Sequence, residues 1–149
     1  MADETNQLRV RLVTPERTLF DHCAAAVELP AKNGYMEVLY GHAPLVAELG
    51  AGDVVVHGAT KSVSEGSGPE GESRYNVSWG FAEVLGDRVT ILAADALKPE
   101  EIDLARAQEQ LARGHKMWGE SGDSEAAFTE SLRVIAEAEA KIASAAENR

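Results

Sequence analysis

Few side chains in this sequence stand at the spacings that enzyme chemistry requires. The histidines are His22, His42, His57 and His115. None belongs to a His-Glu-x-x-His zinc helix. His22 and Cys23 are neighbours, but adjacent residues of a strand point to opposite faces, which predicts a surface histidine beside a buried cysteine. His42 lies in the rigid turn Gly41–Pro44 with no serine nucleophile elbow or spaced carboxylate pair, which favours a structural hydrogen bond or a partner contact. We therefore expect no catalytic residue, no metal site and no enzymatic activity of the isolated chain.

A second group of candidate residues follows Pro99, where a carboxylate stands close to two arginines. Projected as a helix at about 100° per residue, Asp103, Arg106 and Arg113 share one sector with Ile102, so two cations and a carboxylate could converge on a ligand. Arginine forks suit phosphate, and a carboxylate can accept a hydrogen bond from an adenine amine. The alternative is that Asp103 and Arg106 form an ordinary surface pair three residues apart, worth a few tenths of a kcal/mol.

Composition limits the classes of protein that this chain can represent. It has 149 residues, of which 44% are hydrophobic and 26% charged, values typical of a globular protein. Its net charge of -11 argues against a nucleic-acid binder and against electrostatic docking on an anionic membrane. A single cysteine excludes an internal disulfide and a cysteine-rich zinc knuckle. The polar start of the chain and the lack of an apolar run of about 18 residues predict a cytoplasmic protein without direct membrane insertion.

The elements that must carry these residues change character near Pro99. Before it, short alternating segments separated by turn residues predict an all-β sandwich or barrel, because no crossover helix fits there. The expected strands are residues 8–13, 26–29, 35–39, 53–57, 74–77, 81–85 and 88–92. Gly50–Gly52 and Gly80 are interpreted as turns, and Gly86-Asp87 as a tight hairpin. Residues 61–74, rich in glycine and glutamate, predict a long mobile hairpin tip and no phosphate-binding loop.

After Pro99 the sequence predicts an antiparallel hairpin of two helices. Pro99 suits a first helical turn, and Leu104, Leu111 and Trp118 fall on one stripe. Gly114, Gly119 and Gly122 are expected to end this helix and form the loop. Asp123 or Ser124 could cap the second helix. Its expected apolar seam consists of Phe128, Leu132, Ile135 and Ile142. The seam is poor in large side chains, so the hairpin is expected to be held together weakly and to need a docking surface.

Four segments occur in a characteristic order along the chain. They are LRVRLVTPERTLFD from Leu8, NGYMEVLYGHAPLVAELGAG from Asn33, VSWGFAEVLGDRVTILAADA from Val77, and IDLARA from Ile102. In this order and at these spacings they resemble the epsilon subunit of F-type rotary ATP synthases, called delta in mitochondria. The resemblance extends from Leu8 to about Ile142.

The resemblance implies both a fold and a role. The fold is an all-β sandwich of about ten strands, residues 1–96, followed by an antiparallel two-helix hairpin, residues 97–149. The role is that of a non-catalytic central-stalk subunit that binds gamma and the membrane rotor ring at the cytoplasmic face of the bacterial inner membrane. Such a subunit couples proton flow to ATP synthesis. Its C-terminal helices either fold back or extend toward the catalytic head, where they obstruct ATP hydrolysis.

The resemblance also implies site residues. Contacts with gamma and the rotor ring fall to Gly34, Tyr35, Met36, Glu37, Val38, Leu39, Tyr40, Gly41 and His42. The IDLARA motif implies a nucleotide site of Ile102, Asp103, Arg106 and Ala107, together with Arg113. ATP-binding relatives add two arginines four residues apart, where this chain has Glu137 and Lys141. We therefore expect no cofactor, with ATP as a weak regulatory ligand at most.

Two other classes of function stay open at this stage. One is a nucleotide-sensing β-sandwich module with an oligomerising helical tail, and the other is a plain binding module of the same build. From residue 99 onward the chain has six Lys and Arg against eleven Asp and Glu, a net charge of -5. This excess of negative charge opposes attraction between the helices and an acidic segment of the catalytic head.

Overall fold

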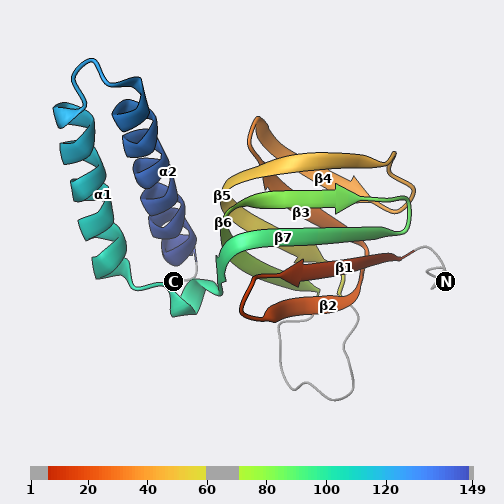
Figure 1. Cartoon of the computed structure of the whole chain (residues 1–149). Helices are drawn as coiled ribbons and strands as arrows, with labels where there is room; N and C mark the ends of the chain where they lie inside the picture. The colour runs from red at the N-terminus through yellow and green to blue at the C-terminus, as the bar shows by residue number, and fades with distance from the viewer. Residues whose placement is uncertain (1–6, 60–70, 148–149) are drawn as a thin grey trace. The chain divides into compact units, whose positions relative to one another are not determined.

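A computed structural model of the chain describes residues 7–59 and 71–147. The chain divides into two compact units, Met1–Ala96 and Leu97–Arg149, at the boundary where its composition changes (Figure 1). Among the described residues, strands make up the first unit, the last of them ending at Leu97, and helices follow in the second. The predicted hairpin tip at residues 61–74 lies mostly outside the described residues.

Seven strands form one sheet in the first unit, in the order β2-β1-β7-β6-β5-β3-β4. Their bounds are β1 Leu8–Val13, β2 Thr18–Ala24, β3 Ala26–Ala31, β4 Gly34–Leu39, β5 Leu45–His57, β6 Glu72–Val84 and β7 Arg88–Leu97. The family resemblance implied about ten strands, which was too high. The segments expected at residues 53–57, 74–77 and 81–85 are parts of β5 and β6, because each of these strands continues for 13 residues through glycines interpreted as turns. Strand β2 was not among the expected strands by range, although His22 and Cys23 were treated as strand residues. The prediction that Cys23 is buried was wrong, because its side chain is only half-buried. The turn at Gly86-Asp87 is confirmed, since Leu85 N–H donates to the Arg88 carbonyl at 2.8 Å.

Both long strands exchange their core-facing side at mid-length. In β5, Leu49 faces the core before the exchange and Val54 after it, and in β6, Val77 and Ala82 do the same. An odd and an even position of one strand can share a face only if the alternation changes phase between them. The strands stay paired across this point, with Leu49 opposite Gly80 and Ala51 opposite Ser78.

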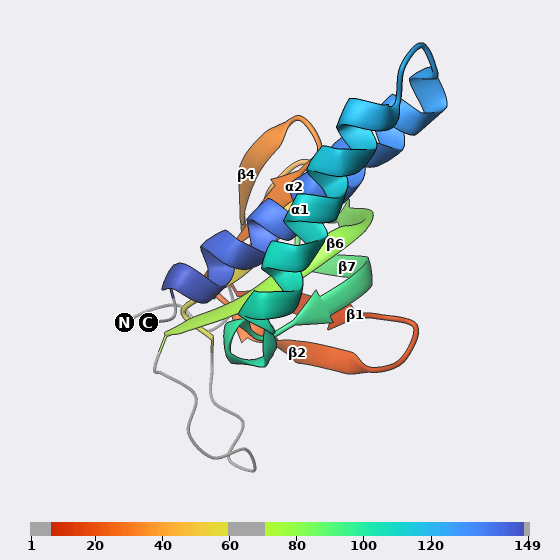
Figure 2. The same ribbon diagram turned by 90° about the vertical axis from the view of Figure 1, so that its left-hand side faces the viewer.

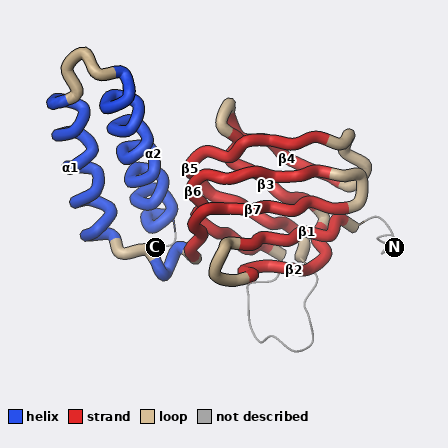
Figure 3. Tube along the Cα trace, in the orientation of Figure 1, coloured by secondary structure: helices blue, strands red, loops and turns tan. Residues whose placement is uncertain are grey.

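The backbone of β6 turns over at Trp79 and Gly80, whose φ angles are 53° and 144°. A left-handed φ is costly for a bulky residue such as tryptophan. At Gly80 a Cβ atom would lie 2.0 Å from the carbonyl oxygen of Leu92 in β7, so only glycine fits. The sheet thereby folds on itself, and Figure 3 shows the strands as two facing layers. The core between them is aliphatic and includes Leu8, Leu12, Leu29, Val56 and Ile91, all completely buried.

The second unit begins with a 3₁₀ turn, η1 Pro99–Glu101, followed by α1 Leu104–Glu120 and α2 Glu125–Glu147. The two helices lie side by side, as the two views of Figures 1 and 2 agree. Pro99 therefore starts the 3₁₀ turn and not the long helix. Gly114 and Gly119 lie inside α1, contrary to the prediction, and of the three glycines only Gly122, with φ of 54°, lies in the connecting turn.

The helices meet through small side chains. The buried residues of α1 are Ala107 and Gly114, and those of α2 are Ser131, Ala138, Ser144 and Ala145. The predicted seam was wrong in part, because Phe128 and Leu132 are exposed, as is Trp118 on α1. Ser124 caps α2, since its Oγ accepts from Ala127 N–H at 3.2 Å. No helix among the described residues is long and apolar enough to span a membrane.

Candidate functional site

The segment Gly34–His42 consists of the edge strand β4 and the turn that follows it. Strand β4 pairs with β3 from Gly34, opposite Ala31, to Leu39, opposite Ala26. Its side chains alternate, so Val38 is completely buried and Met36 packs against the core. Tyr35, Leu39 and Tyr40 are 65%, 55% and 45% exposed. Any partner surface on this strand therefore consists of alternate residues and excludes Val38.

The turn after β4 is fixed by hydrogen bonds. Gly41, with φ of 87°, donates its N–H to the carbonyl of Gly86 in the β6–β7 turn at 2.7 Å. His42 N–H donates to the Leu39 carbonyl at 3.1 Å. The His42 ring Nδ1 lies 2.7 Å from the Ala43 carbonyl oxygen, which can only accept, so Nδ1 is the donor. His42 thus makes the structural hydrogen bond that was one of its two expected roles.

A second group of exposed apolar residues lies on β5, β6 and β7. Val46, Phe81 and Leu92 are each more than half exposed. Val46 stands opposite Glu83 and Phe81 opposite Glu48, so Val46 and Phe81 are each paired with an acidic residue across the strands. Large apolar side chains with a charged border are typical of surfaces that bind other proteins.

The predicted nucleotide motif is split between a cap and a helix. Ile102 is extended, with ψ of 124°, and Asp103 is the N-cap of α1. The Asp103 carboxylate accepts from Arg106 N–H at 3.2 Å. The projection onto one continuous helix was therefore wrong for Ile102 and Asp103, because α1 begins only at Leu104.

The rest of the motif lies on α1. Ala107 is buried, whereas Arg106 and Arg113 are exposed two turns apart on the same helix. On α2, Lys141 and Glu137, which replace the two arginines of ATP-binding relatives, form an ion pair at 3.1 Å. The exposed arginines of α1 can contact an anion, and the lysine of α2 is already paired with a carboxylate.

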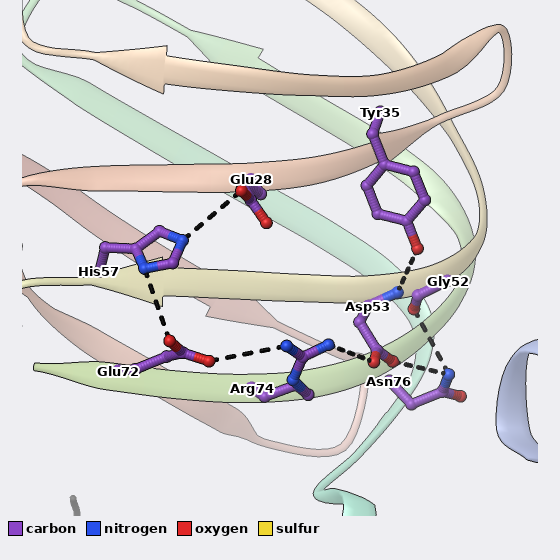
Figure 4. Close-up of polar contacts among 8 residues, drawn as sticks. All are labelled: Glu28, Tyr35, Gly52, Asp53, His57, Glu72, Arg74 and Asn76. Carbon is purple, nitrogen blue, oxygen red and sulfur yellow. Dashed lines mark hydrogen bonds and ion pairs between the residues drawn. The ribbon is translucent and has the colours of Figure 1, made fainter. Parts of the chain in front are cut away.

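A polar network covers the outer side of β3, β5 and β6 (Figure 4). His57 lies 3.7 Å from Glu28 and 3.8 Å from Glu72. Arg74 bridges Glu72, at 3.6 Å, and Asp53, at 3.0 Å. Among the residues that the structure describes, no three His, Cys, Asp or Glu side chains are arranged to hold a metal ion. The network therefore joins strands.

Sequence reasoning missed this network. The signal was present, because Asp53 and His57 alternate on β5 while Glu72, Arg74 and Asn76 alternate on β6. Antiparallel pairing brings these two rows onto one face. The pairing itself could not be inferred without knowing that β5 and β6 are neighbours.

Comparison with known proteins identifies the family. The family described as "ATP synthase, Delta/Epsilon chain, beta-sandwich domain" matches residues 7–99, more than half of the chain. The chain belongs to the delta/epsilon family of ATP synthase subunits. Its relatives include the ATP synthase epsilon chain of Koribacter versatilis, 42% identical over 113 residues, or 74% of this chain and 71% of the relative. The epsilon chain of Solibacter usitatus is 39% identical over 111 residues, or 73% and 74% of the two chains.

A solved structure agrees in fold. A chain of the Euglena gracilis mitochondrial ATP synthase superposes with a TM-score of 0.72, covering 93% of this chain and 81% of that one at 23% identity. The resemblance stated from the sequence is thus confirmed, as is the class of fold, a β-sandwich followed by two helices. As a member of the family the chain is an epsilon subunit of an F-type ATP synthase, and epsilon chains are non-catalytic subunits.

Proposed function

We propose that this epsilon subunit sits in the central stalk, bound to gamma and to the membrane rotor ring, at the cytoplasmic face of the bacterial inner membrane. There it turns with the ring and couples proton flow to ATP synthesis. Its relatives are named epsilon chains, and chains of similar fold come from assemblies titled "OSCP/F1/c-ring" and "central stalk/cring".

The observation that carries the proposal is the exposure of large apolar side chains in two places on the sandwich. One surface comprises Tyr35, Leu39 and Tyr40, and the other Val46, Phe81 and Leu92. Burying such side chains in an interface contributes about 1.5–3 kcal/mol each relative to leaving them in water. We assign the first surface to the rotor ring and the second to gamma, so that one small subunit holds two partners at once.

A pair of matched substitutions tests this assignment. Phe81→Glu should weaken binding to purified gamma by tenfold or more, because it places a charge at the centre of the gamma surface. Leu39→Glu, an equally exposed apolar residue on β4, should leave gamma binding unchanged and weaken retention on a gamma–ring assembly. Titration measures the affinity for gamma, and co-elution at micromolar concentration measures retention on the gamma–ring assembly. Failure of the wild-type chain to co-elute with its own gamma subunit would contradict the proposal.

The C-terminal helices contact the catalytic head in the same proposal, but they inhibit ATP hydrolysis only weakly. The support is their net charge of -5 from residue 99 onward, because an acidic hairpin gains little attraction from an acidic partner. Deleting residues 99–149 from the assembled complex should raise ATP hydrolysis less than tenfold. A larger rise would show that individual contacts, such as those of Arg106 or Arg113, outweigh the net charge.

ATP is in this proposal a weak ligand of the helices. Arg106 and Arg113 are exposed on α1, but the Asp103 carboxylate already accepts the Arg106 N–H as a cap. Lys141 is paired with Glu137. Titration calorimetry with ATP and magnesium should give no low-micromolar binding. A tight constant that Arg106→Ala abolishes would overturn this expectation.

A further inference from the structure

The outermost part of the sheet is joined to β5 by an interrupted ladder. Strand β4 lies at the edge beyond β3. Strand β3 pairs with β5 as far as Glu28, opposite Val55, and again at Ala31, opposite Leu49, with a register shift between them. Asp53 and Pro30 lie inside this gap. A backbone N–H in a gap of this kind needs another acceptor.

The side chain of Tyr35 supplies that acceptor. Tyr35 stands opposite Pro30 in the β3–β4 register, so its ring extends across β3 toward β5. The backbone N–H of Asp53 donates to its hydroxyl oxygen at 3.1 Å, as Figure 4 shows. One side chain from the edge strand thereby contacts a strand two places away.

Gly52 provides the space that the tyrosine occupies. A Cβ atom at Gly52 would lie 2.5 Å from the Tyr35 hydroxyl oxygen, 2.7 Å from Pro30 Cβ and 3.3 Å from Tyr35 Cζ. Any larger residue would therefore displace the ring. Tyr35 is only about one-third buried, but its hydroxyl group lies between β3 and β5.

The carboxylate of Asp53 is also held by hydrogen bonds. Its carboxylate accepts from Arg74 Nη1 at 3.0 Å and from Asn76 Nδ2 at 3.1 Å, both on β6. Asp53 and Asn76 are buried. Because buried charges without partners are costly, the ion pair and the amide together fix the position of Asp53. The contacts of Tyr35 thus end on a rigid point of the sheet.

From this arrangement the structure assigns Tyr35 the role of a clasp that holds the ring-facing segment Gly34–His42 in position. The clasp comprises Tyr35, Gly52 and Asp53, and it keeps the edge hairpin of β3 and β4 attached where the ladder is interrupted. The inference rests on the proposed function, because the segment that the clasp positions is the one assigned to the rotor ring. Tyr35 acts here as a positioning residue through its hydroxyl, in addition to its exposed ring.

Amide hydrogen exchange in the full chain tests the clasp directly. Tyr35→Phe removes only the hydroxyl, so it should accelerate exchange of the Asp53 amide by about two- to tenfold, the factor that the loss of one ordinary hydrogen bond implies. Tyr40→Phe removes the same group from an exposed tyrosine of the same segment and should leave the Asp53 amide unchanged. Equal exchange of that amide in the wild type and Tyr35→Phe would overturn the clasp.

Binding to the rotor tests its consequence. Tyr35→Phe and Gly52→Ala should both leave gamma affinity unchanged and weaken retention on a gamma–ring assembly severalfold. Gly119→Ala, at a glycine of α1 with open space around its added Cβ, should change neither gamma affinity nor retention on the gamma–ring assembly. If only Tyr35→Phe weakened retention, the hydroxyl would contact the ring directly and the positioning role would be wrong. If the wild-type chain bound the gamma–ring assembly no more tightly than gamma alone, the proposed function would be refuted. The amide-exchange experiment would still show whether the clasp exists.

Discussion

Among the three glycines of the hairpin, Gly114 is the one where an added Cβ atom would meet other atoms. It is buried in the middle of α1, and a Cβ there would lie 2.7 Å from Ile135 Cγ1 and 3.2 Å from Val134 Cγ1. Favourable carbon–carbon contacts are about 3.5–4.0 Å, so α2 would have to retreat by several tenths of an ångström or more. The backbone nitrogen of Ile135, at 3.3 Å, prevents a simple change of rotamer from relieving the clash.

The expected magnitude combines two opposing effects. Overpacking a closely packed contact costs about 1–3 kcal/mol, whereas glycine to alanine in a helix interior gains about 0.8–1.0 kcal/mol. Gly114→Ala should therefore destabilise the hairpin by up to about 2 kcal/mol. Gly119→Ala, five residues along the same helix with no atom near the added Cβ, should stabilise it by up to about 1 kcal/mol. The two variants should differ by about 1–3 kcal/mol.

Amide exchange of α1 in the full chain measures this difference. The Ala107 N–H, which donates to the Asp103 carbonyl at 3.0 Å, reports local opening of the hairpin. Its exchange should be about five- to 150-fold faster in Gly114→Ala than in Gly119→Ala, as 1–3 kcal/mol implies. If both alanines slowed exchange equally, the helices would not approach closely at Gly114 and the small-residue interface would be wrong.

Three further predictions concern the fold and the motif. Gly80→Ala should lower the free energy of unfolding of the sandwich by more than 2 kcal/mol in urea denaturation, because its Cβ would meet the Leu92 carbonyl and its φ is left-handed, whereas Gly86→Ala should be within about 1 kcal/mol of the wild type. Asp103→Ala should cost the hairpin about 1 kcal/mol as a lost cap, and Asp103→Asn should retain most of it; equal losses in circular dichroism melts would show that the side chain does not cap. A chain ending at Ala96 should unfold cooperatively and keep its gamma affinity, since the core lies wholly within that unit; loss of either property would make the helices part of the core.

The class of fold could be predicted because alternation and turn chemistry are local signals. The β6–β7 hairpin and the two helices followed from Gly86-Asp87 and from the composition after Pro99. The bounds of β5 and β6 could not be predicted, because a glycine inside a bent strand resembles a glycine in a turn. What makes Gly80 part of β6 is the approach of the Leu92 carbonyl, a contact between residues twelve apart.

In the candidate site too, the features with local signals could be predicted and those set by pairing between distant residues could not. Exposure of Tyr35, Leu39 and Tyr40 could be expected from an apolar segment rich in turn residues, whereas burial of Val38 depends on the register of β4. The cap formed by Asp103 required knowing that α1 begins at Leu104. The clasp required three strands, since Tyr35, Pro30 and Gly52 meet only through the order β5-β3-β4.

The hairpin's small interface has a consequence for how it responds to partners. The buried residues Ala107, Gly114, Ser131 and Ala138 are all small, whereas Trp118, Phe128 and Leu132 remain exposed. Burial of each exposed side chain can contribute about 1.5–3 kcal/mol. We therefore expect a surface that covers these three side chains to stabilise the hairpin where it docks. For the same reason, we expect differential contacts with partners to set the equilibrium position of the helices.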